Sequence, residues 1–226
     1  MDKLISVAID GPSGAGKSTV AKAIAAKFGF VYVDTGAIYR TVGLAVQRAG
    51  LASDAAEAIV ALLPSLNIDI SYDGEGTQRM LLNGEDVSAE IRTPKSSLYA
   101  SDVSKLPEVR AFLMELQRGM ARRHSVIMDG RDIGTVVLPE AEVKIFLTAD
   151  AAVRAKRRWL ELQAKGTADS FEQVLRDIEY RDQQDSSRAA APLKPAEDAV
   201  LLDSSAMGFE QTVAAVSALI EEKRKA

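Results

Sequence analysis

Residues 4–18 read LISVAIDGPSGAGKS, in which a short apolar run leads directly into the complete pattern G-x-x-x-x-G-K-[ST]. In this pattern a glycine-rich loop turns its backbone N–H groups toward phosphate oxygens, the lysine reaches the outer phosphates, and the final hydroxyl can hold Mg²⁺. The stretch therefore predicts a site for the phosphates of a nucleoside triphosphate. Its expected members are Gly11, Pro12, Ser13, Gly14, Ala15, Gly16, Lys17, Ser18 and Thr19.

The residues on either side of the loop support this prediction. Residues 4–9 form a short run rich in Ile and Val, typical of a strand buried on both faces of a parallel sheet. Apolar side chains recur at helical spacing over residues 19–28, and Gly29 is a typical residue for ending a helix. A strand, a loop and a helix N-terminus thus follow in order, and the helix dipole favours an anion there. The alternative is a glycine-rich turn that binds no ligand.

The rest of the chain alternates in the manner of an α/β protein. A strand over 31–34 and a helix over 38–49, closed by Gly50, give a βαβ unit. The pattern changes between residues 64 and 92, where alternating residues and the turn sequence Asn83-Gly84 predict a small antiparallel insert. Further helices are expected over 96–105, 108–123, 151–165, 170–187 and 209–223, and further strands over 125–129, 144–148 and 200–203.

Composition and charge exclude several classes of protein. With 226 residues, 47% hydrophobic and 27% charged, the chain has the composition of a globular enzyme, and its net charge of −4 argues against a nucleic-acid binder. It has no Cys, hence no disulfide or thiolate metal site, and its one His, His124, lies in a basic run typical of a solvated helix end. The sequence shows no leader and no apolar stretch long enough to span a membrane, so we expect a cytoplasmic monomer without membrane contact.

Four aspartates follow expected strands, at the edge where open parallel sheets bind ligands. Asp129 follows an apolar run and is a candidate acidic partner of the phosphate loop, acting on Mg²⁺ directly or through water. We also favour a functional role for Asp34. For Asp10 and Asp203 a cap or turn role is the favoured interpretation, because an Asp that ends a strand commonly serves a turn.

A second group of candidates consists of arginines. The helices over 151–165 and 170–187 are unusually polar, for which a solvated surface is the ordinary explanation. Phosphoryl transfer, however, needs positive charge around the moving group, and arginines on a closing lid supply it while excluding water. The arginines of this expected lid are Arg154, Arg157, Arg158, Arg181 and Arg188, and Arg40 and Arg131 lie near the sheet edge.

Four segments together resemble one family over nearly the whole chain. They are Asp10–Ser18 (DGPSGAGKS), Asp34–Arg40 (DTGAIYR), Asp129–Val137 (DGRDIGTVV) and Arg181–Arg188 (RDQQDSSR). The combination is similar to bacterial-type cytidylate (CMP) kinases of the P-loop nucleoside monophosphate kinase family. The resemblance implies a three-layer α/β fold with a central parallel sheet. It also implies a core over 1–63, 93–150 and 189–226, a monophosphate-binding insert over about 64–92 and a helical lid over about 151–188.

The resemblance implies roles for individual residues. Those matching Ser101, Arg110 and Asp132 hold the cytosine ring, whose exocyclic amine suits a carboxylate and whose acceptors suit a guanidinium. Uracil would leave buried groups unpaired, so selectivity for cytosine is expected. For Tyr39 a purely structural role as a buried aromatic is the alternative. The other expected residues are Arg181 and Asp185 for the sugar; Arg40, Arg131 and Arg188 for the acceptor phosphate; Thr35, Tyr39 and Asp129 for the acceptor pocket; Arg157 for ATP; Lys17, Arg131, Arg158 and Arg188 for catalysis; and Ser18 for the metal.

The expected reaction is transfer of the γ-phosphoryl group of ATP to CMP or dCMP with Mg²⁺, giving ADP and CDP or dCDP. The acceptor phosphate, with a second pKa near ~6, is largely deprotonated at neutral pH, so no general base is required. A kinase for another small acceptor, such as uridylate or adenylate, is the nearest alternative, and Asp132 with Arg110 is the pair that discriminates. A nucleotide-dependent switch is a further alternative, although the N-K-x-D motif of GTP-binding proteins is absent from the sequence.

Overall fold

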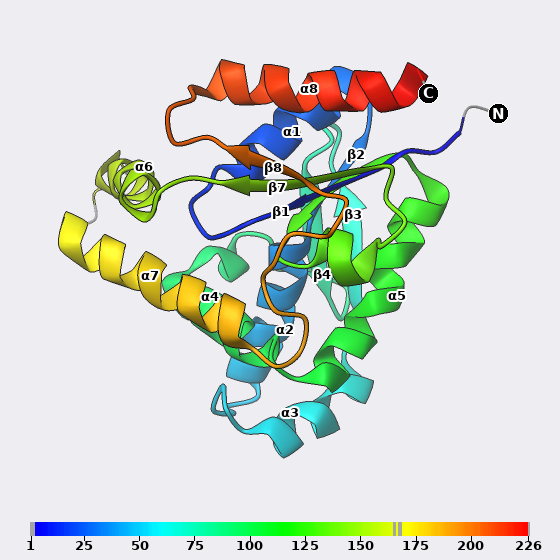
Figure 1. The fold of residues 1–226 in the computed structure, drawn as a ribbon. Helices are drawn as coiled ribbons and strands as arrows, with labels where there is room; N and C mark the ends of the chain where they lie inside the picture. Colours follow the sequence, from blue (N-terminus) through cyan, green and yellow to red (C-terminus); the bar gives the residue numbers. More distant parts are fainter. Residues whose placement is uncertain (1–2, 165, 167–168, 226) are drawn as a thin grey trace. The chain divides into compact units, whose positions relative to one another are not determined.

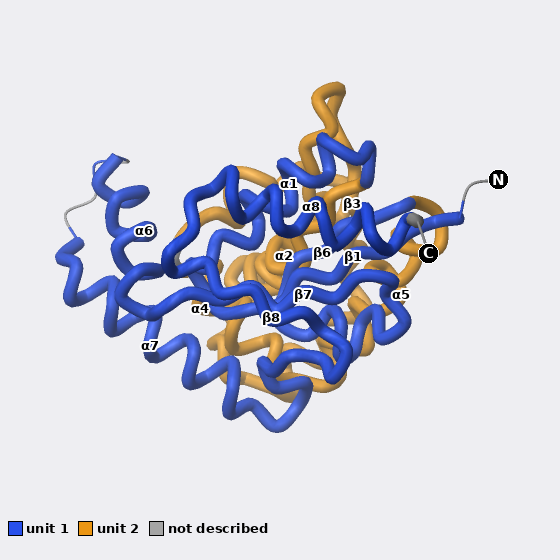
Figure 2. Tube along the Cα trace, turned by 45° about the horizontal axis from the view of Figure 1, so that its top comes forward, with its two compact units in different colours: residues 1–30, 125–226 blue, residues 31–124 orange. Residues whose placement is uncertain are grey.

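The computed structural model describes residues 3–164, 166 and 169–225. The chain divides into two compact units (Figure 2). Unit 1 comprises residues 1–30 and 125–226, and unit 2 comprises residues 31–124. The phosphate loop and the polar helical hairpin belong to unit 1, and the antiparallel strands belong to unit 2.

Unit 1 is built on a parallel sheet in which four strands follow the order β6-β1-β7-β8. They are β1 (Ser6–Asp10), β6 (Val126–Gly130), β7 (Val143–Thr148) and β8 (Val200–Asp203). Ile9 of β1 pairs with Asp129 on one side and Ile145 on the other, and residues 7–9 are fully buried. A strand buried on both faces needs a continuous apolar run such as this one. The carboxyl ends of β1 and β6, where Asp10 and Asp129 stand, therefore lie side by side.

Two helices of unit 1 pack together over this sheet. α1 (Lys17–Phe28) follows the loop after β1 and ends at Gly29, whose φ is +68°. It contacts α8 (Phe209–Lys225), and Figure 1 shows both helices on the same side of the strands. The C-terminal glycine is the residue type that adopts this left-handed conformation without a steric cost. The helix that the sequence predicts after the phosphate loop is thus present.

α6 (Ala151–Ala164) and α7 (Phe171–Ser187) form a helical hairpin (Figure 1). A small apolar core holds the two together, made by Ala155, Val174 and Ile178. Ser170 caps α7, because its Oγ accepts a hydrogen bond from the Gln173 N–H at 3.2 Å. The helix expected over 170–187 is therefore present, with Ser170 as its N-cap. Lys165, expected to end the first of these helices, lies outside the described residues.

Unit 2 begins with β2 (Val31–Asp34), α2 (Thr35–Arg48), α3 (Ala56–Leu62) and a 3₁₀ turn at Leu63–Ser65. An antiparallel sheet follows, of β3 (Ile68–Tyr72), β4 (Gln78–Leu82) and β5 (Glu85–Asp86) in that order. A second 3₁₀ turn (Glu90–Arg92) leads to α4 (Pro94–Val103) and α5 (Pro107–Arg123). Asn83 and Gly84 both have positive φ, which the predicted tight turn between β4 and β5 requires.

The predicted fold class is confirmed: a parallel sheet with helices, a small antiparallel sheet and a helical hairpin are all present. Several short elements of the described residues were not predicted, among them the two 3₁₀ turns. Another is α3, which is short and whose N-cap residue, Ala55, offers no side-chain cap. A further one is a turn of π-helix, η3 (Ile133–Val137), which begins three residues after the end of β6. The assignment of residue ranges to a core, an insert and a lid remains a prediction.

Candidate active site

The phosphate loop joins β1 to α1 in a backbone conformation that requires its glycines. Gly11 has a φ of +146°, and a Cβ at this position would lie 2.0 Å from the Leu147 carbonyl oxygen of β7. Gly14 and Gly16 have φ values of +76° and +86°. The loop thus enters the N-terminus of α1 in left-handed steps that residues with side chains rarely adopt. This geometry directs backbone N–H groups and the helix dipole toward an anion.

Lys17 is the first residue of α1, and its side chain is buried. Its Nζ donates a hydrogen bond to the Pro12 carbonyl oxygen at 2.8 Å, so the side chain folds back over the loop. Burial lowers the pKa of Lys17 to about 7, and the positive charge of Arg131 acts in the same direction. Asp129 and Asp10 oppose this shift. An anion brought to the loop would restore the charge of this ammonium group.

Ser18 and Asp129 connect the loop with β6. The Ser18 Oγ donates to Asp129 Oδ2 at 2.7 Å, and Asp129 is buried. A hydroxyl and a carboxylate are oxygen ligands of the kind that Mg²⁺ takes from proteins, while phosphates and water fill its other positions. In the described part of the chain, no group of three or more His, Cys, Asp or Glu side chains could hold a metal by itself. The donor set therefore fits a Mg²⁺ ion shared with a nucleotide.

Two ion pairs link the segment after β6 to the end of α7. Arg131 Nε donates to Asp185 Oδ2 at 2.7 Å, and Arg188 Nη2 lies 3.4 Å from Asp132 Oδ1. Burial acts to raise the pKa of Asp185, but Arg131 and then Arg188 and Arg181 outweigh it, so that this pKa is lowered. The structure thus brings four of the expected substrate residues into two neighbouring pairs.

Arg154 is a residue of the hairpin that the sequence alone did not single out from its neighbours. It is nearly fully buried, and its Nη1 donates to the Ser13 carbonyl oxygen of the phosphate loop at 2.9 Å. Its Nε donates to the Ala149 carbonyl oxygen at 2.7 Å, and its Nη2 lies 2.7 Å from Asp182 Oδ2. A Cβ on Gly14 would lie 3.2 Å from the Cβ of Arg154. Arg154 therefore joins the loop, the end of β7 and α7 through one guanidinium group.

The two remaining arginines of α6 face different surroundings. Arg157 donates from Nη2 to the Ser204 carbonyl oxygen at 2.7 Å, just beyond the end of β8. Arg158 is exposed and pairs with Glu161 at 3.1 Å on the same helix. Their expected roles in ATP binding and catalysis remain predictions. For Arg158, the ion pair shown is the solvated arrangement that the sequence offered as the alternative.

The strand-ending aspartates Asp10 and Asp203 behave differently from each other. Asp203 accepts from the N–H and the Oγ of Ser205, which is the local turn role expected of it. Asp10 also serves a turn, but a distant one: its two oxygens accept from the N–H groups of Ile133 and Gly134, each at 2.7 Å. Burial raises the pKa of Asp10 to about 6, although these two hydrogen bonds act to lower it. No local sequence signal indicates this long-range cap.

In unit 2, the residues expected around the acceptor phosphate gather at the start of α2. Asp34 caps this helix by accepting from the Ala37 N–H at 2.8 Å, and its other oxygen pairs with Arg40 at 2.9 Å. Thr35 is buried. Gln78 of β4, which the sequence did not indicate, accepts from the Asp34 N–H at 2.7 Å and donates to its carbonyl oxygen at 3.3 Å. Through Gln78, the antiparallel sheet thus fixes the backbone at the start of α2, the helix that carries Arg40.

The residues of unit 2 expected around the base lie on α4 and α5. Arg110 is buried, its guanidinium lies 5.8 Å from the centre of the Tyr39 ring, and Nη1 donates to the Ser104 carbonyl oxygen at 3.5 Å. The carbonyl oxygen of Ser101 accepts from the Ser104 Oγ at 2.8 Å. Tyr39 is half-buried against this arginine, which is compatible with either of its expected roles.

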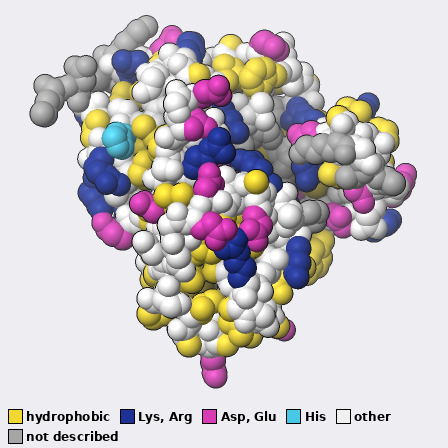
Figure 3. Space-filling model, turned by 180° about the vertical axis from the view of Figure 1, so that it is seen from behind, with side chains coloured by type: hydrophobic (Ala, Val, Ile, Leu, Met, Phe, Trp, Pro, Cys, Tyr) yellow, Lys and Arg dark blue, Asp and Glu magenta, His cyan; other side chains and the backbone are white. Residues whose placement is uncertain are grey.

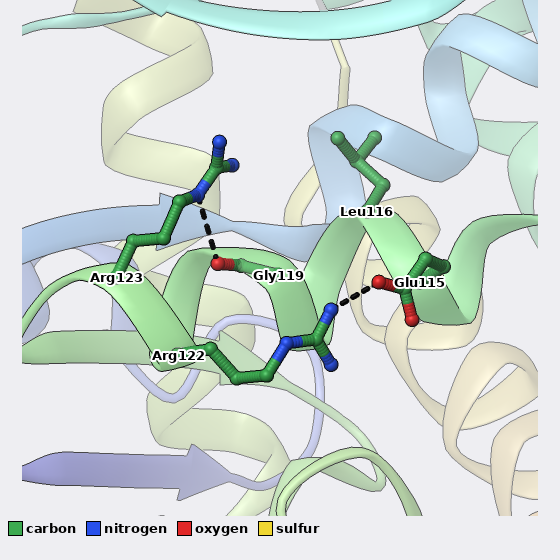
Figure 4. Close-up of a pocket in the computed structure, with 5 residues that line it drawn as sticks. All are labelled: Glu115, Leu116, Gly119, Arg122 and Arg123. Atoms are coloured by element: carbon green, nitrogen blue, oxygen red, sulfur yellow. Dashed lines mark hydrogen bonds and ion pairs between the residues drawn. The ribbon is translucent and has the colours of Figure 1, made fainter.

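A surface hollow on α5 is lined by none of the expected residues (Figure 4). Its arginines are already engaged: Arg122 pairs with Glu115, and Arg123 Nε donates to the Gly119 carbonyl oxygen at 3.1 Å. The hollow is therefore no candidate for the site. His124, at the end of the same helix, is exposed as expected, and Figure 3 shows the histidine in cyan at the surface. No helix in the described ranges combines the length and apolar character needed to cross a membrane.

The chain is similar over almost its whole length to proteins of one family. Residues 7–222 match the family model described as cytidylate kinase. A cytidylate kinase from Caldicellulosiruptor saccharolyticus is 50% identical over 211 residues, covering 93% of this chain and 93% of that protein. A cytidylate kinase from Syntrophotalea carbinolica is 47% identical over 225 residues, covering 100% of this chain and 95% of that protein.

Solved structures agree on the fold. A shikimate kinase from Bacteroides thetaiotaomicron has a TM-score of 0.50 at 14% identity, covering 97% of this chain and 99% of that one. An uncharacterized protein from Eubacterium ventriosum has a TM-score of 0.51 at 11% identity, covering 96% and 98%. At such identity the likeness concerns the fold alone, whereas the family match extends from β1 and its phosphate loop to the terminal helix. The chain therefore belongs to the cytidylate kinase family.

Proposed function

We propose that this chain transfers the γ-phosphoryl group of ATP to the 5′-phosphate of CMP or dCMP, with Mg²⁺, and releases ADP and CDP or dCDP. Family membership supports the reaction. The observation that carries the phosphate chemistry is the loop at residues 11–18, closed by buried Lys17 and tied to Asp129 through Ser18. The alternative of a nucleotide-dependent switch has no comparable support.

The donor site is assigned to the phosphate loop. Its backbone N–H groups would hold the phosphates of ATP, and Lys17 would leave its bond to Pro12 and move its ammonium group to the outer phosphates. Arg157 is assigned to ATP binding. It lies on α6 together with Arg154, whose hydrogen bond to the Ser13 carbonyl oxygen supports the loop. These residues bind and align the donor before any bond changes.

Ser18 and Asp129 are assigned to Mg²⁺. Their oxygens lie 2.7 Å apart, so both can face one small cation, directly or through water. Bound there, Mg²⁺ would neutralise charge on the phosphates of the donor. Asp129 would hold the Ser18 hydroxyl in position whether it contacts the cation itself or through a water molecule.

The acceptor needs alignment rather than a base. A phosphate monoester is largely a dianion at neutral pH, so one of its oxygens can attack the γ-phosphorus while the bond to the bridging oxygen of ADP breaks, and no proton has to move. Arg40, Arg131 and Arg188 are assigned to the phosphates, where their positive charge would stabilise the transferring group. In the structure each has an acidic partner, Asp34, Asp185 and Asp132 respectively, which keeps the guanidinium groups ordered.

The base is assigned to Ser101, Arg110 and Asp132, and the sugar to Arg181 and Asp185. A carboxylate accepts from the exocyclic amine of cytosine, whereas uracil would set a carbonyl oxygen against it. Asp132 is buried, so that an unpaired group there would carry a substantial cost. The hairpin of α6 and α7 would close over the reacting groups and exclude water.

An ADP-release assay with ATP and Mg²⁺ tests this proposal when CMP, dCMP, UMP, AMP and no acceptor are compared side by side. Strong turnover with CMP and weak turnover with UMP support both the reaction and the assignment of Asp132 and Arg110. Turnover that does not depend on the acceptor would contradict the transfer, and equal turnover with CMP and UMP would contradict the base assignment. Sedimentation of the same sample checks the expected monomer.

A further inference from the structure

A single buried carboxylate holds the segment that follows β6. Asp10 ends β1, and its two oxygens accept from the consecutive N–H groups of Ile133 and Gly134, each at 2.7 Å. Ile133 and Gly134 lie more than 120 positions further along the chain than Asp10. All three residues are buried. A Cβ on Gly134 would lie 3.4 Å from Asp10 Oδ2, so the backbone approaches the carboxylate closely.

These two N–H groups need an acceptor because they begin a helical turn. The first N–H groups of any helix have no partner within it, and a carboxylate satisfies them while its charge complements the helix dipole. In η3 the Asp132 carbonyl oxygen already accepts from the N–H groups of Val136 and Val137. Asp10 therefore completes the hydrogen bonding of η3 at its start, from a different part of the sequence.

Asp132 is the residue that this arrangement holds in place. It immediately precedes Ile133, it is the N-cap residue of η3, and its backbone has the uncommon angles φ −149° and ψ 28°. Its carboxylate is buried and lies 3.4 Å from Arg188. With the next two N–H groups bonded to Asp10 and its own carbonyl oxygen bonded within η3, the backbone of Asp132 is held in place, and with it the direction of its Cα–Cβ bond.

We propose that Asp10 is a positioning residue for base selection, which sets the orientation of Asp132 through the N–H groups of Ile133 and Gly134. The inference rests on the proposed recognition of cytosine by Asp132. It does not make Asp10 a catalytic residue, because both of its oxygens are used by η3. The phosphate loop has its own internal bond, from Lys17 Nζ to the Pro12 carbonyl oxygen.

The test is Asp10→Asn, an exchange of nearly equal volume. An amide can accept from one N–H group but would turn its NH₂ toward the other, so η3 and Asp132 should shift. Displacement of a positioned group by about 1 Å can cost on the order of 100-fold in rate. We therefore expect the ratio of kcat/KM for CMP to that for UMP to fall by about tenfold or more, while KM for ATP is unchanged.

Asp203→Asn is the matched control. Asp203 also ends a strand of the parallel sheet, but within the described part of the chain its carboxylate accepts hydrogen bonds from the nearby Ser205. This variant should keep the CMP to UMP ratio of the parent protein. If KM for ATP rises in Asp10→Asn as much as KM for CMP, Asp10 supports the phosphate loop instead and the proposal is overturned. A lower melting temperature with an unchanged ratio would also overturn it, as a merely structural role.

A double-mutant cycle separates this proposal from the one on which it rests. In the background of Asp132→Ala, the effect of Asp10→Asn on CMP should disappear if Asp10 acts through Asp132. Full additivity would overturn the positioning role while leaving the function intact. If Asp132→Ala itself leaves the CMP to UMP ratio unchanged, the base assignment fails and this inference fails with it.

Folding of the variant is expected, because burial raises the pKa of Asp10 to about 6 and a neutral side chain avoids the desolvation of the charge. Should Asp10→Asn nevertheless fail to fold, Asp10→Glu provides the measurement. It keeps both acceptor oxygens and the charge but moves them by one methylene group, so the CMP to UMP ratio should fall here too. An unchanged ratio in a folded Asp10→Glu protein would overturn the proposal.

Discussion

Arg154→Met removes the guanidinium group that joins the phosphate loop to the helical hairpin. In the structure this side chain is only 6% exposed, and its guanidinium group contacts the carbonyl oxygens of Ser13 and Ala149 and the carboxylate of Asp182. Met fills a similar length without strain, so the variant loses the charge and the hydrogen bonds rather than the packing. We expect it to lose both stability and affinity for ATP.

The magnitude follows from what the substitution leaves behind. Removing one partner of a buried ion pair costs about 3–5 kcal/mol. Asp182 is 24% exposed, which places the cost near the lower end of that range, although its Oδ1 is buried and has no hydrogen-bond partner among the residues that the structure describes. For a chain of this size about 1 kcal/mol corresponds to about 2–4 °C in Tm, so a fall of about 6–12 °C is expected.

Thermal unfolding of Arg154→Met beside Arg158→Met provides the measurement. Arg158 lies on the same helix, but it pairs with exposed Glu161, a type of ion pair worth less than about 1 kcal/mol. Arg154→Lys should lie between the two, because lysine keeps the charge but not the planar fork. Equal Tm values for Arg154→Met and Arg158→Met would refute the joining role of Arg154.

Two further predictions concern the phosphate loop itself. Burial lowers the pKa of Lys17 to about 7 in the free protein, and bound phosphates should raise this pKa again. Above about pH 7, nucleotide binding therefore takes up a proton, whereas below this pH Lys17 is already charged before the nucleotide binds. Calorimetry should measure the affinity for the magnesium complex of a non-hydrolysable ATP analogue at several pH values. The affinity should be constant below about pH 7 and weaken by up to about tenfold per pH unit above it. An affinity that stays constant up to about pH 9 would contradict the role given to Lys17. Gly11→Ala would set a Cβ 2.0 Å from the Leu147 carbonyl oxygen, so the pairing of β1 with β7 must shift. The Tm of this variant should fall much more than that of Gly29→Ala. At Gly29, φ is +68° but an added Cβ would meet nothing within 4 Å, so the substitution costs only about 1–2 kcal/mol for the left-handed conformation. Equal falls in Tm would show that the contact with Leu147 is relieved without consequence.

Local patterns predicted the elements that have local causes. The apolar run of β1, the glycines of the loop and the glycine that ends α1 each act within a few residues of their own position. The helix α3 was missed because seven residues without a capping side chain give too weak a signal. Its position depends on tertiary packing, since Ile59 is fully buried.

The parts of the site that could not be predicted depend on distant partners. The sequence offers several arginines at helical spacing, but nothing in it distinguishes Arg154, which is buried against the Ser13 carbonyl oxygen, from exposed Arg158 four residues later. Likewise the side chain of Asp132, the N-cap residue of η3, does not cap this helical turn, and its first N–H groups bond to the distant Asp10 instead. Long-range hydrogen bonds of this kind become visible only when the fold is known.

In the proposed reaction the γ-phosphoryl group passes directly to the phosphate of a cytidine nucleotide. The measurement that tests it most directly uses ATP labelled in its γ-phosphate, incubated with the protein, Mg²⁺ and CMP and separated by anion-exchange chromatography. We predict that the label appears in CDP, in step with the formation of ADP. Label in inorganic phosphate with CMP unchanged would contradict the account.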